Sequence, residues 1–198
     1  MKKGLYSFVV CLSFLVGCQN DKVNELELIS FYDEFLMEVN ELFAYHTYEE
    51  EMFFNEKYHT EESIRSILAP YMTEEGMNQF LADHYIQEDQ RFVYNGEFQD
   101  YLRDYSRNSS YYDITRQTIF NPGLRMISRE LEVNALAEEV ELRADGVPVR
   151  FYSEESMYGQ TQFGELGYPA VDHLSLTVKM VKDKDEYRIQ YVEVDSET

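Results

Sequence analysis

Both cysteines of the chain lie within its first 18 residues, and the second of them, Cys18, ends a segment laid out like a secretory signal. Two lysines follow the initial methionine, residues 5–16 form an apolar run without charge, and Gly17 places a small residue directly before Cys18. As a helix this run spans about 18 Å, whereas the hydrocarbon core of a bilayer is about 30 Å thick, so we do not interpret it as a transmembrane anchor. The segment is therefore predicted to direct export of the chain and to be cleaved.

The last four residues of this segment, Leu15 to Cys18, resemble the lipobox of bacterial lipoproteins. The resemblance implies that a diacylglyceryl group is transferred to Cys18, that cleavage occurs between Gly17 and Cys18, and that the mature chain begins at the lipidated cysteine. It also implies a location at the extracytoplasmic face of the cell membrane, with the membrane itself as a partner through the lipid anchor. One acyl chain binds a bilayer only marginally, whereas two or more hold stably.

These features divide the chain into three parts: a lipoprotein signal peptide over residues 1–17, the lipidated cysteine with a short tether over residues 18–22, and one folded domain over residues 23–198. Cleavage would leave about 180 residues, which is ample for one hydrophobic core. The mature part would then hold no free thiol, because Cys11 leaves with the signal and Cys18 carries lipid. Thiol catalysis and thiolate metal sites are excluded on this interpretation.

The net charge of the chain is −21, and removal of its two leading lysines with the signal gives −23. A nucleic acid is not an expected partner, because binding a phosphate backbone requires a basic face. An anionic bilayer surface should also repel the folded part, so the lipid must supply the attachment. Two interpretations of the acidity are open: a solvated surface, which we favour, and attraction of a positively charged partner such as a basic peptide or metal ions.

The four histidines, His46, His59, His84 and His173, are far apart in the sequence and form no His-Glu-x-x-His pair. The sequence also lacks a Gly-x-Ser-x-Gly nucleophile motif and a phosphate-binding glycine loop. His84 falls on an apolar helical face, which predicts a hydrogen-bonded core histidine. His173 lies opposite the apolar face of its strand, which predicts contact with solvent or a pocket. We therefore predict no catalytic residue, no metal ligand and no cofactor.

The first half of the folded part is predicted to be helical. Between residues 23 and 43, apolar side chains recur with the helical period on one broad face. Thr60 and Thr73 each precede two glutamates, as an N-cap precedes an acidic first turn, and together they predict a pair of short helices packed on one core.

The second half is predicted to form strands. Residues 112–120 are a candidate strand, and Asp145-Gly146 between alternating apolar residues predicts a two-residue hairpin turn. The clearest alternation covers residues 172–181, followed by a charged turn over residues 182–186 that leads into a last strand with Tyr187, Ile189 and Tyr191.

Three segments fit more than one structure. Residues 45–59 fit an extension of the first helix or a loop that tucks its aromatic side chains inward. Residues 87–110 are expected to be mostly irregular, with a helical turn around residues 98–105. Residues 128–143 fit a strand or a helix, and we favour a strand broken by a bulge or a turn near residues 136–138.

Helices followed by a strand meander predict the α+β class, with N-terminal helices packed on an antiparallel sheet. This layout, with Leu68-Ala69-Pro70-Tyr71-Met72-Thr73-Glu74-Glu75 inside the helical pair, is similar to the NTF2-like or cystatin-like domains, and in particular to lipoproteins of Gram-positive bacteria, many of unknown function. The resemblance implies a curved sheet that wraps the helices into a cone with a pocket at its mouth.

Three functions are weighed on these grounds. The preferred hypothesis is a membrane-tethered, non-enzymatic module that binds a small molecule, a peptide or an envelope protein. The alternative is an NTF2-like acid–base enzyme, of the isomerase or dehydratase type, acting on a small apolar substrate in a buried pocket. An accessory subunit of an envelope complex is the third hypothesis.

Overall fold

The structure is a computed structural model, and it describes residues 24–103, 110–136, 138–153, 155–157, 161, 167–184 and 186–198. The predicted signal peptide, Cys18 and the tether lie outside the described residues. No helix in the described ranges combines the length and the apolar character that a membrane span needs.

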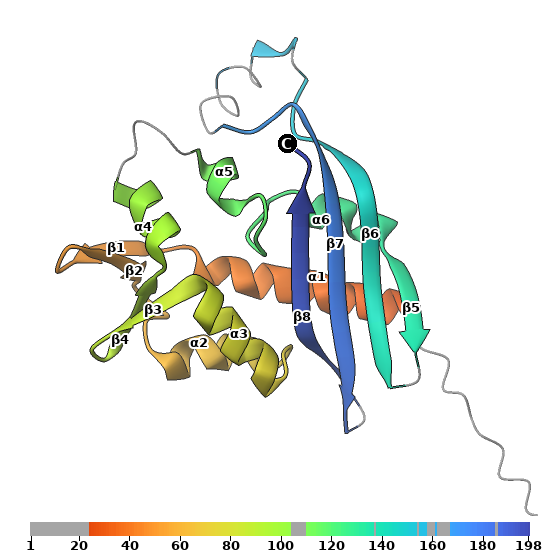
Figure 1. Cartoon of the computed structure of the whole chain (residues 1–198), viewed down its shortest axis with the longest axis horizontal. Helices are drawn as coiled ribbons and strands as arrows, with labels where there is room; N and C mark the ends of the chain where they lie inside the picture. Colours follow the sequence, from red (N-terminus) through yellow and green to blue (C-terminus); the bar gives the residue numbers. More distant parts are fainter. Residues whose placement is uncertain are drawn as a thin grey trace, which may run out of the picture.

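A four-stranded antiparallel sheet in the order β5-β6-β7-β8 forms one layer, and helix α1 crosses one of its faces (Figure 1). The predicted α+β class, with N-terminal helices on an antiparallel sheet, is confirmed. The strands of the sheet are β5 Glu132–Leu136, β6 Glu139–Arg150, β7 Val171–Asp183 and β8 Glu186–Ser196. Strand β7 follows its predicted alternation, since Leu174, Leu176, Val178 and Met180 are all buried.

Helix α1, Glu25–Leu42, turns its predicted apolar face to the core, where Tyr32, Phe35 and Val39 are fully buried. Its C-terminal end is satisfied by Asn55, a buried side chain whose amide donates to the carbonyl of Glu41 at 2.7 Å and to that of Ala44 at 2.8 Å. This bond pattern fixes the path of the chain beyond α1, because carbonyls at a helix end need partners outside the helix.

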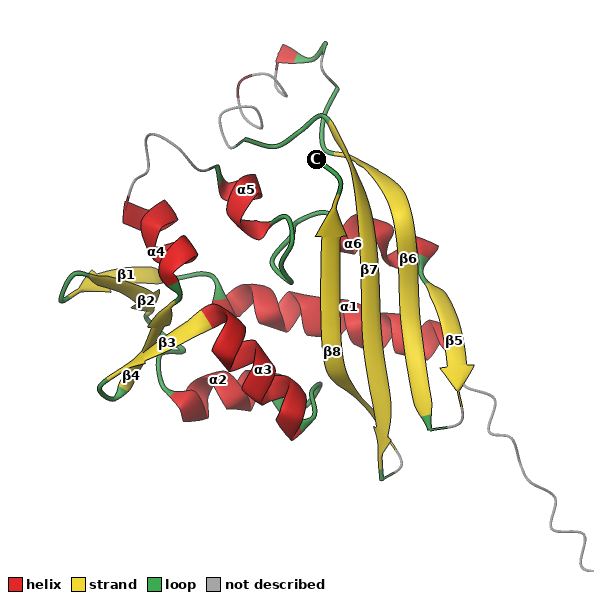
Figure 2. Cartoon of the chain, in the orientation of Figure 1, coloured by secondary structure: helices red, strands yellow, loops and turns green. Residues whose placement is uncertain are grey.

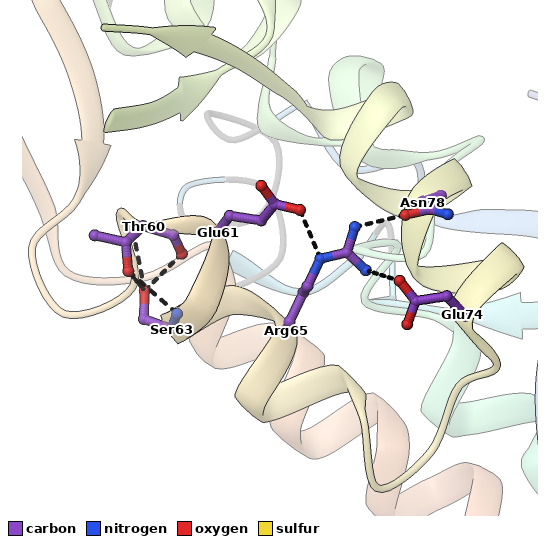
Figure 3. A network of polar contacts seen from close by, with 6 residues as sticks. All are labelled: Thr60, Glu61, Ser63, Arg65, Glu74 and Asn78. Carbon is purple, nitrogen blue, oxygen red and sulfur yellow. Dashed lines mark hydrogen bonds and ion pairs between the residues drawn. The ribbon is translucent and has the colours of Figure 1, made fainter. Parts of the chain in front are cut away.

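The predicted helical pair is present as α2 Glu61–Leu68 and α3 Glu74–His84, with Thr60 and Thr73 as their N-caps. The Thr60 cap is reciprocal with Ser63. Figure 3 shows Arg65 of α2 reaching three partners: Glu61 at 2.7 Å, Glu74 at 3.1 Å and Asn78 at 2.5 Å. Because Glu74 and Asn78 both belong to α3, Arg65 links the two helices.

Two small hairpins occupy segments that the sequence left irregular or ambiguous (Figure 2). They are β1 His46–Glu49 with β2 Met52–Asn55, and β3 Tyr85–Glu88 with β4 Arg91–Tyr94. Their turns place Glu50, Glu51 and Asp89 at positive φ, where glycine or asparagine is the usual signal. Helix α4, Gly96–Arg103, follows, so the helical turn predicted from residue 98 is confirmed as far as the described residues extend.

The predicted strand over residues 112–120 is wrong, because helix α5, Tyr111–Thr115, occupies its first part. Ser110 and Asp113 form a reciprocal capping box in which each side chain accepts from the other's backbone amide. This local bonding outweighs the strand preference of the β-branched residues that follow. Helix α6, Leu124–Ile127, and a 3₁₀ turn, Ser128–Glu130, lead into β5, so residues 132–136 form the strand that we favoured.

The predicted hairpin at Asp145-Gly146 is also wrong, because β6 continues through it. The register with β7 shifts between Ala144 and Val147, and Gly146 adopts a φ of +57° within this irregularity. Its amide donates to the hydroxyl of Ser175 at 2.9 Å. A residue with positive φ occurs in bulges as well as in turns, so the dipeptide Asp145-Gly146 alone does not distinguish a bulge from a hairpin turn.

A buried carboxylate joins α5 to the last two strands. Asp172 of β7 is 1% exposed and accepts hydrogen bonds from the hydroxyls of Tyr112, Ser196 and Thr198 and from the amide of His173. Burial alone would raise its pKa, but these bonds favour the charged form more strongly, so the pKa of Asp172 lies below its ordinary value.

We expect Asp172→Asn to lower the free energy of unfolding at pH 7 by about 1–3 kcal/mol, because the charged acceptor is lost while the hydroxyls of Tyr112 and Ser196 stay buried. A carboxylate whose pKa is lowered by folding stabilises the folded state at pH values above its ordinary pKa, about 3.9. This contribution is lost as the pH falls through the lower pKa of the folded state. The difference from the wild type should therefore shrink below pH 4 in urea unfolding followed by circular dichroism.

Asp183→Asn, at the exposed end of the same strand, is the matched control and should leave the stability unchanged. A deficit of Asp172→Asn that is the same at pH 7 and pH 3 would contradict a stabilising buried carboxylate.

Candidate ligand cavity

A cavity of about 440 Å³ lies between helix α3 and strand β8. Its remaining walls come from the start of α4 and from the segment that follows α5, which lies between these elements in Figure 1. We call it the α3–β8 cavity. Its lining includes Phe80, Asp83, His84, Glu97, Phe98, Ile119, Val192 and Glu193.

The connection between α2 and α3 pairs with β8 and sets one end of the cavity. The amide of Thr73 donates to the carbonyl of Ile189 at 2.9 Å, and the amide of Ile189 donates to the carbonyl of Tyr71 at 2.8 Å. Met72 and Ile189 thus form a parallel bridge at the outer edge of the sheet. Helix α3 therefore begins in contact with β8.

Gly76 in the first turn of α3 permits this contact. A Cβ atom at this position would lie 2.9 Å from the carbonyl oxygens of both Ile189 and Gln190. Only a residue without a side chain therefore fits between the helix and the backbone of the strand. The sequence contained this glycine, but a glycine near a helix start does not by itself predict a close approach.

A bulge in β8 decides which of its side chains line the cavity. Tyr191 lies opposite Lys179 and Ile189 opposite Met180, so the strand has one extra residue, Gln190, between them. Ile189 is fully buried, but Tyr191 is 40% exposed. Ile189 and Tyr191 therefore differ in burial although they are two residues apart, and Val192, opposite Val178, turns inward.

The floor of the cavity is aromatic. Phe80 and Phe98 are 5% and 2% exposed, and their neighbour Ile119 is also buried. The ring of Phe120 packs behind them at 5.5 Å from that of Phe98. These rings are themselves covered, so the apolar surface that a ligand could bury comes from Tyr191, which is 40% exposed, and from the half-buried Val192 and Val194.

His84 closes the inner end of α3 against these rings. Its imidazole lies 4.7 Å from the ring of Phe80, 5.0 Å from that of Phe120 and 6.2 Å from that of Phe98. The apolar surroundings predicted for His84 are confirmed, but it lines a cavity, and the described residues provide no hydrogen-bond partner for its ring. Burial lowers the pKa of His84 to about 4, so the ring is neutral at pH 7.

The other histidines lie elsewhere. His46 contacts the hydroxyl of Tyr94 at 3.2 Å, His59 contacts the carbonyl of Glu56 at 3.1 Å, and His173 is exposed on the outer face of the sheet. In the described part of the chain no three histidine, cysteine or acidic side chains gather as a metal site would require.

Three carboxylates stand at the mouth of the cavity, on three different elements. Asp83 belongs to α3, Glu97 to α4 and Glu193 to β8, and all three are exposed. Among the described lining residues there is no lysine or arginine. The mouth is therefore negative while the floor is apolar.

A second cavity, of about 870 Å³, lies between the tips of the two hairpins. Its lining is largely charged, and Arg91 within it pairs with Glu49 at 3.2 Å. No phenylalanine or tyrosine is among the described residues that line it. We favour the smaller α3–β8 cavity as the ligand site, since it offers apolar surface to bury.

We expect Gly76→Ala to destabilise the protein by about 1–3 kcal/mol, because the added methyl group forces α3 away from β8. Helix propensity alone predicts the opposite sign, since alanine is favoured over glycine inside a helix. Gly96→Ala is the control, because nothing lies within 4 Å of its added Cβ. Equal thermal unfolding midpoints for the two variants would show that the close approach is absent.

The comparisons with known proteins add no family to this geometry. No protein-family model matches the chain, and no curated protein matches it.

Proposed function

We propose that the chain is a lipoprotein of the extracytoplasmic membrane face, anchored through Cys18, whose folded part binds a small molecule in the α3–β8 cavity. The observation that carries the proposal is the cavity itself, with its aromatic floor and polar mouth. Its volume lies in the range of about 300–1,000 Å³ that is typical of small-molecule sites. The layout of helices, antiparallel sheet and cavity also fits the NTF2-like domains that the sequence resembles.

The position of the first helix agrees with such an anchor. Helix α1 begins seven residues after Cys18 and starts beside β5, at one edge of the sheet (Figure 1). The cavity adjoins β8, the strand at the opposite edge. Three inter-strand spacings of about 4.8 Å each separate β5 from β8. A membrane near the start of α1 therefore lies at the opposite edge of the sheet from the cavity and leaves the cavity accessible.

The alternative, an acid–base enzyme, has His84 as its supporting observation. A general base works best when its pKa is close to the operating pH. With a pKa of about 4, and without a hydrogen-bond partner for its ring in the described residues, His84 is a weak base at pH 7. This favours binding over catalysis.

We expect Cys18→Ala to release the protein from the membrane fraction or to leave it as an uncleaved precursor, because the thiol that receives the lipid is gone. Intact-mass analysis of the wild type should show a chain that starts at residue 18 and carries lipid. Cys11→Ala is the matched control and should behave as the wild type. Retention of a processed Cys18→Ala chain in the membrane would refute the anchor.

We expect Val192→Phe to weaken binding of a neutral apolar probe, 4-phenylbutan-1-ol, by about tenfold or more, because the larger side chain occupies the cavity. The probe is titrated against the full chain in phosphatidylcholine nanodiscs and followed by nuclear magnetic resonance, with empty nanodiscs subtracted. His173→Phe, on the exposed outer face of β7, should leave binding unchanged. The same affinity in both variants would place the probe outside the cavity and refute it as the binding site.

A further inference from the structure

We propose that His84 is an acid-sensitive latch of the α3–β8 cavity. Its neutral imidazole packs against three walls of the cavity, and its protonation at acidic pH makes the ring leave them and loosens their contact. The device goes beyond the proposed function, because it operates without a bound ligand.

The contacts of the imidazole come from three separate elements. Its ring lies 4.7 Å from that of Phe80 in α3, 6.2 Å from that of Phe98 in α4 and 5.0 Å from that of Phe120 in the segment that follows α5. All three phenylalanine rings are buried. His84 therefore lies where three walls of the cavity meet.

The backbone around His84 joins two of the same walls. The amide of Asn95 donates to the carbonyl of His84 at 2.9 Å, and the side-chain amide of Asn95 donates to the carbonyl of Asp83 at 2.6 Å. The side-chain oxygen of Asn95 accepts from the amide of Phe98, in the first turn of α4, at 3.3 Å. Asn95 thus links the end of α3 to the start of α4, and exchange of its amide proton reports whether the two are in contact.

Protonation is unfavourable while the imidazole is packed in this position. Burial lowers the pKa of His84 from the ordinary 6.5 to about 4. The C-terminal end of a helix favours a charged histidine, but burial outweighs this effect here. A ring that has left the aromatic side chains regains its ordinary pKa in water, so acid favours the conformations in which the imidazole is released.

The pH range of the latch follows from these two pKa values. At pH 7.5 the packed and the released imidazole are both neutral, and the latch is closed. Below the ordinary pKa the released form gains population by about tenfold per pH unit, until the packed form is protonated as well. Between pH 7.5 and pH 5 the released population should rise about 30-fold.

The carboxylates of the cavity oppose the latch without cancelling it. Asp83 of α3, Glu97 of α4 and Glu193 of β8 line the cavity together with His84, and their negative charge attracts an imidazolium. The pKa of His84 is lowered in the presence of all three, so burial outweighs their attraction.

The two tyrosines that adjoin the latch stay neutral in this pH range. Burial raises the pKa of Tyr85, the residue after His84, well above the ordinary value. Tyr191 lines the cavity from β8, and partial burial raises its pKa as well; Lys179 lies over its ring, 5.8 Å from the centroid. Residues 117–119, which line the cavity from the segment after α5, carry no titratable side chain.

The test measures hydrogen exchange at the amide of Asn95 by nuclear magnetic resonance, in the full chain in phosphatidylcholine nanodiscs. We expect its protection factor, which is corrected for the intrinsic pH dependence of exchange, to fall about 30-fold between pH 7.5 and pH 5. In His84→Gln, whose side chain is polar but cannot be protonated, the protection factor should not change with pH. His173→Gln, at the exposed histidine on the outer face of β7, is the matched control and should behave as the wild type.

A second variant and a second measurement cover the case in which His84→Gln does not fold. His84→Phe keeps a ring among the aromatic side chains and should also abolish the pH dependence. In the wild type, the ¹³Cε1 shift of the His84 imidazole should titrate with a midpoint well below 6.5. A midpoint near 6.5 would show that the packed ring binds a proton without cost, and it would overturn the latch.

Two further outcomes would overturn it. One is a protection factor of Asn95 that does not change with pH in the wild type. The other is an equal fall in the wild type and in the variants at position 84, which would assign the pH dependence to other groups. Neither outcome affects the small-molecule site, because that proposal is tested separately by the binding of 4-phenylbutan-1-ol.

Discussion

The contact between helix α3 and the edge of strand β8 is the constraint on which the candidate site depends. An uncovered edge strand offers unpaired amides and carbonyls to other chains, and proteins commonly cover it. Here the link between α2 and α3 pairs with Ile189, and Gly76 lets the helix begin against the strand. Helix α3 then leaves β8 at an angle (Figure 1), and the space that opens between them is the α3–β8 cavity. The same contact that protects the edge thus creates the site.

Buried polar side chains hold the elements around that site. Asn55 satisfies the end of α1, and Gln99 of α4 bonds both the amide and the carbonyl of Phe53, at 2.8 and 2.6 Å, as a neighbouring strand would. Asp172 gathers α5 and the end of β8 around one carboxylate. These groups lie where irregular segments meet regular ones, so the cavity walls from α4 and the α5 segment are anchored by hydrogen bonds as well as by apolar packing.

Local patterns predicted the parts of the fold that local forces decide. The caps at Thr60 and Thr73, helix α1 and strand β7 follow from side-chain periodicity and capping chemistry. The two hairpins were missed because Glu50 and Asp89 occupy turn positions where glycine is the usual signal.

The site itself could not be predicted in this way. It depends on the extra residue in β8, which appears only in the pairing of β8 with β7, and on the close approach at Gly76, which joins segments more than a hundred residues apart. The sequence did place His84 and Phe80 on one helical face, which is the local part of the cavity. Its acidic mouth combines residues 83, 97 and 193, which no local pattern connects.

The central claim is that a ligand lies between α3 and β8, against the aromatic floor. Nuclear Overhauser contacts between the ring protons of bound 4-phenylbutan-1-ol and assigned side chains test it most directly. The account predicts contacts to His84, Phe80 and Val192. Contacts confined to the hairpin tips or to the outer face of the sheet would contradict it.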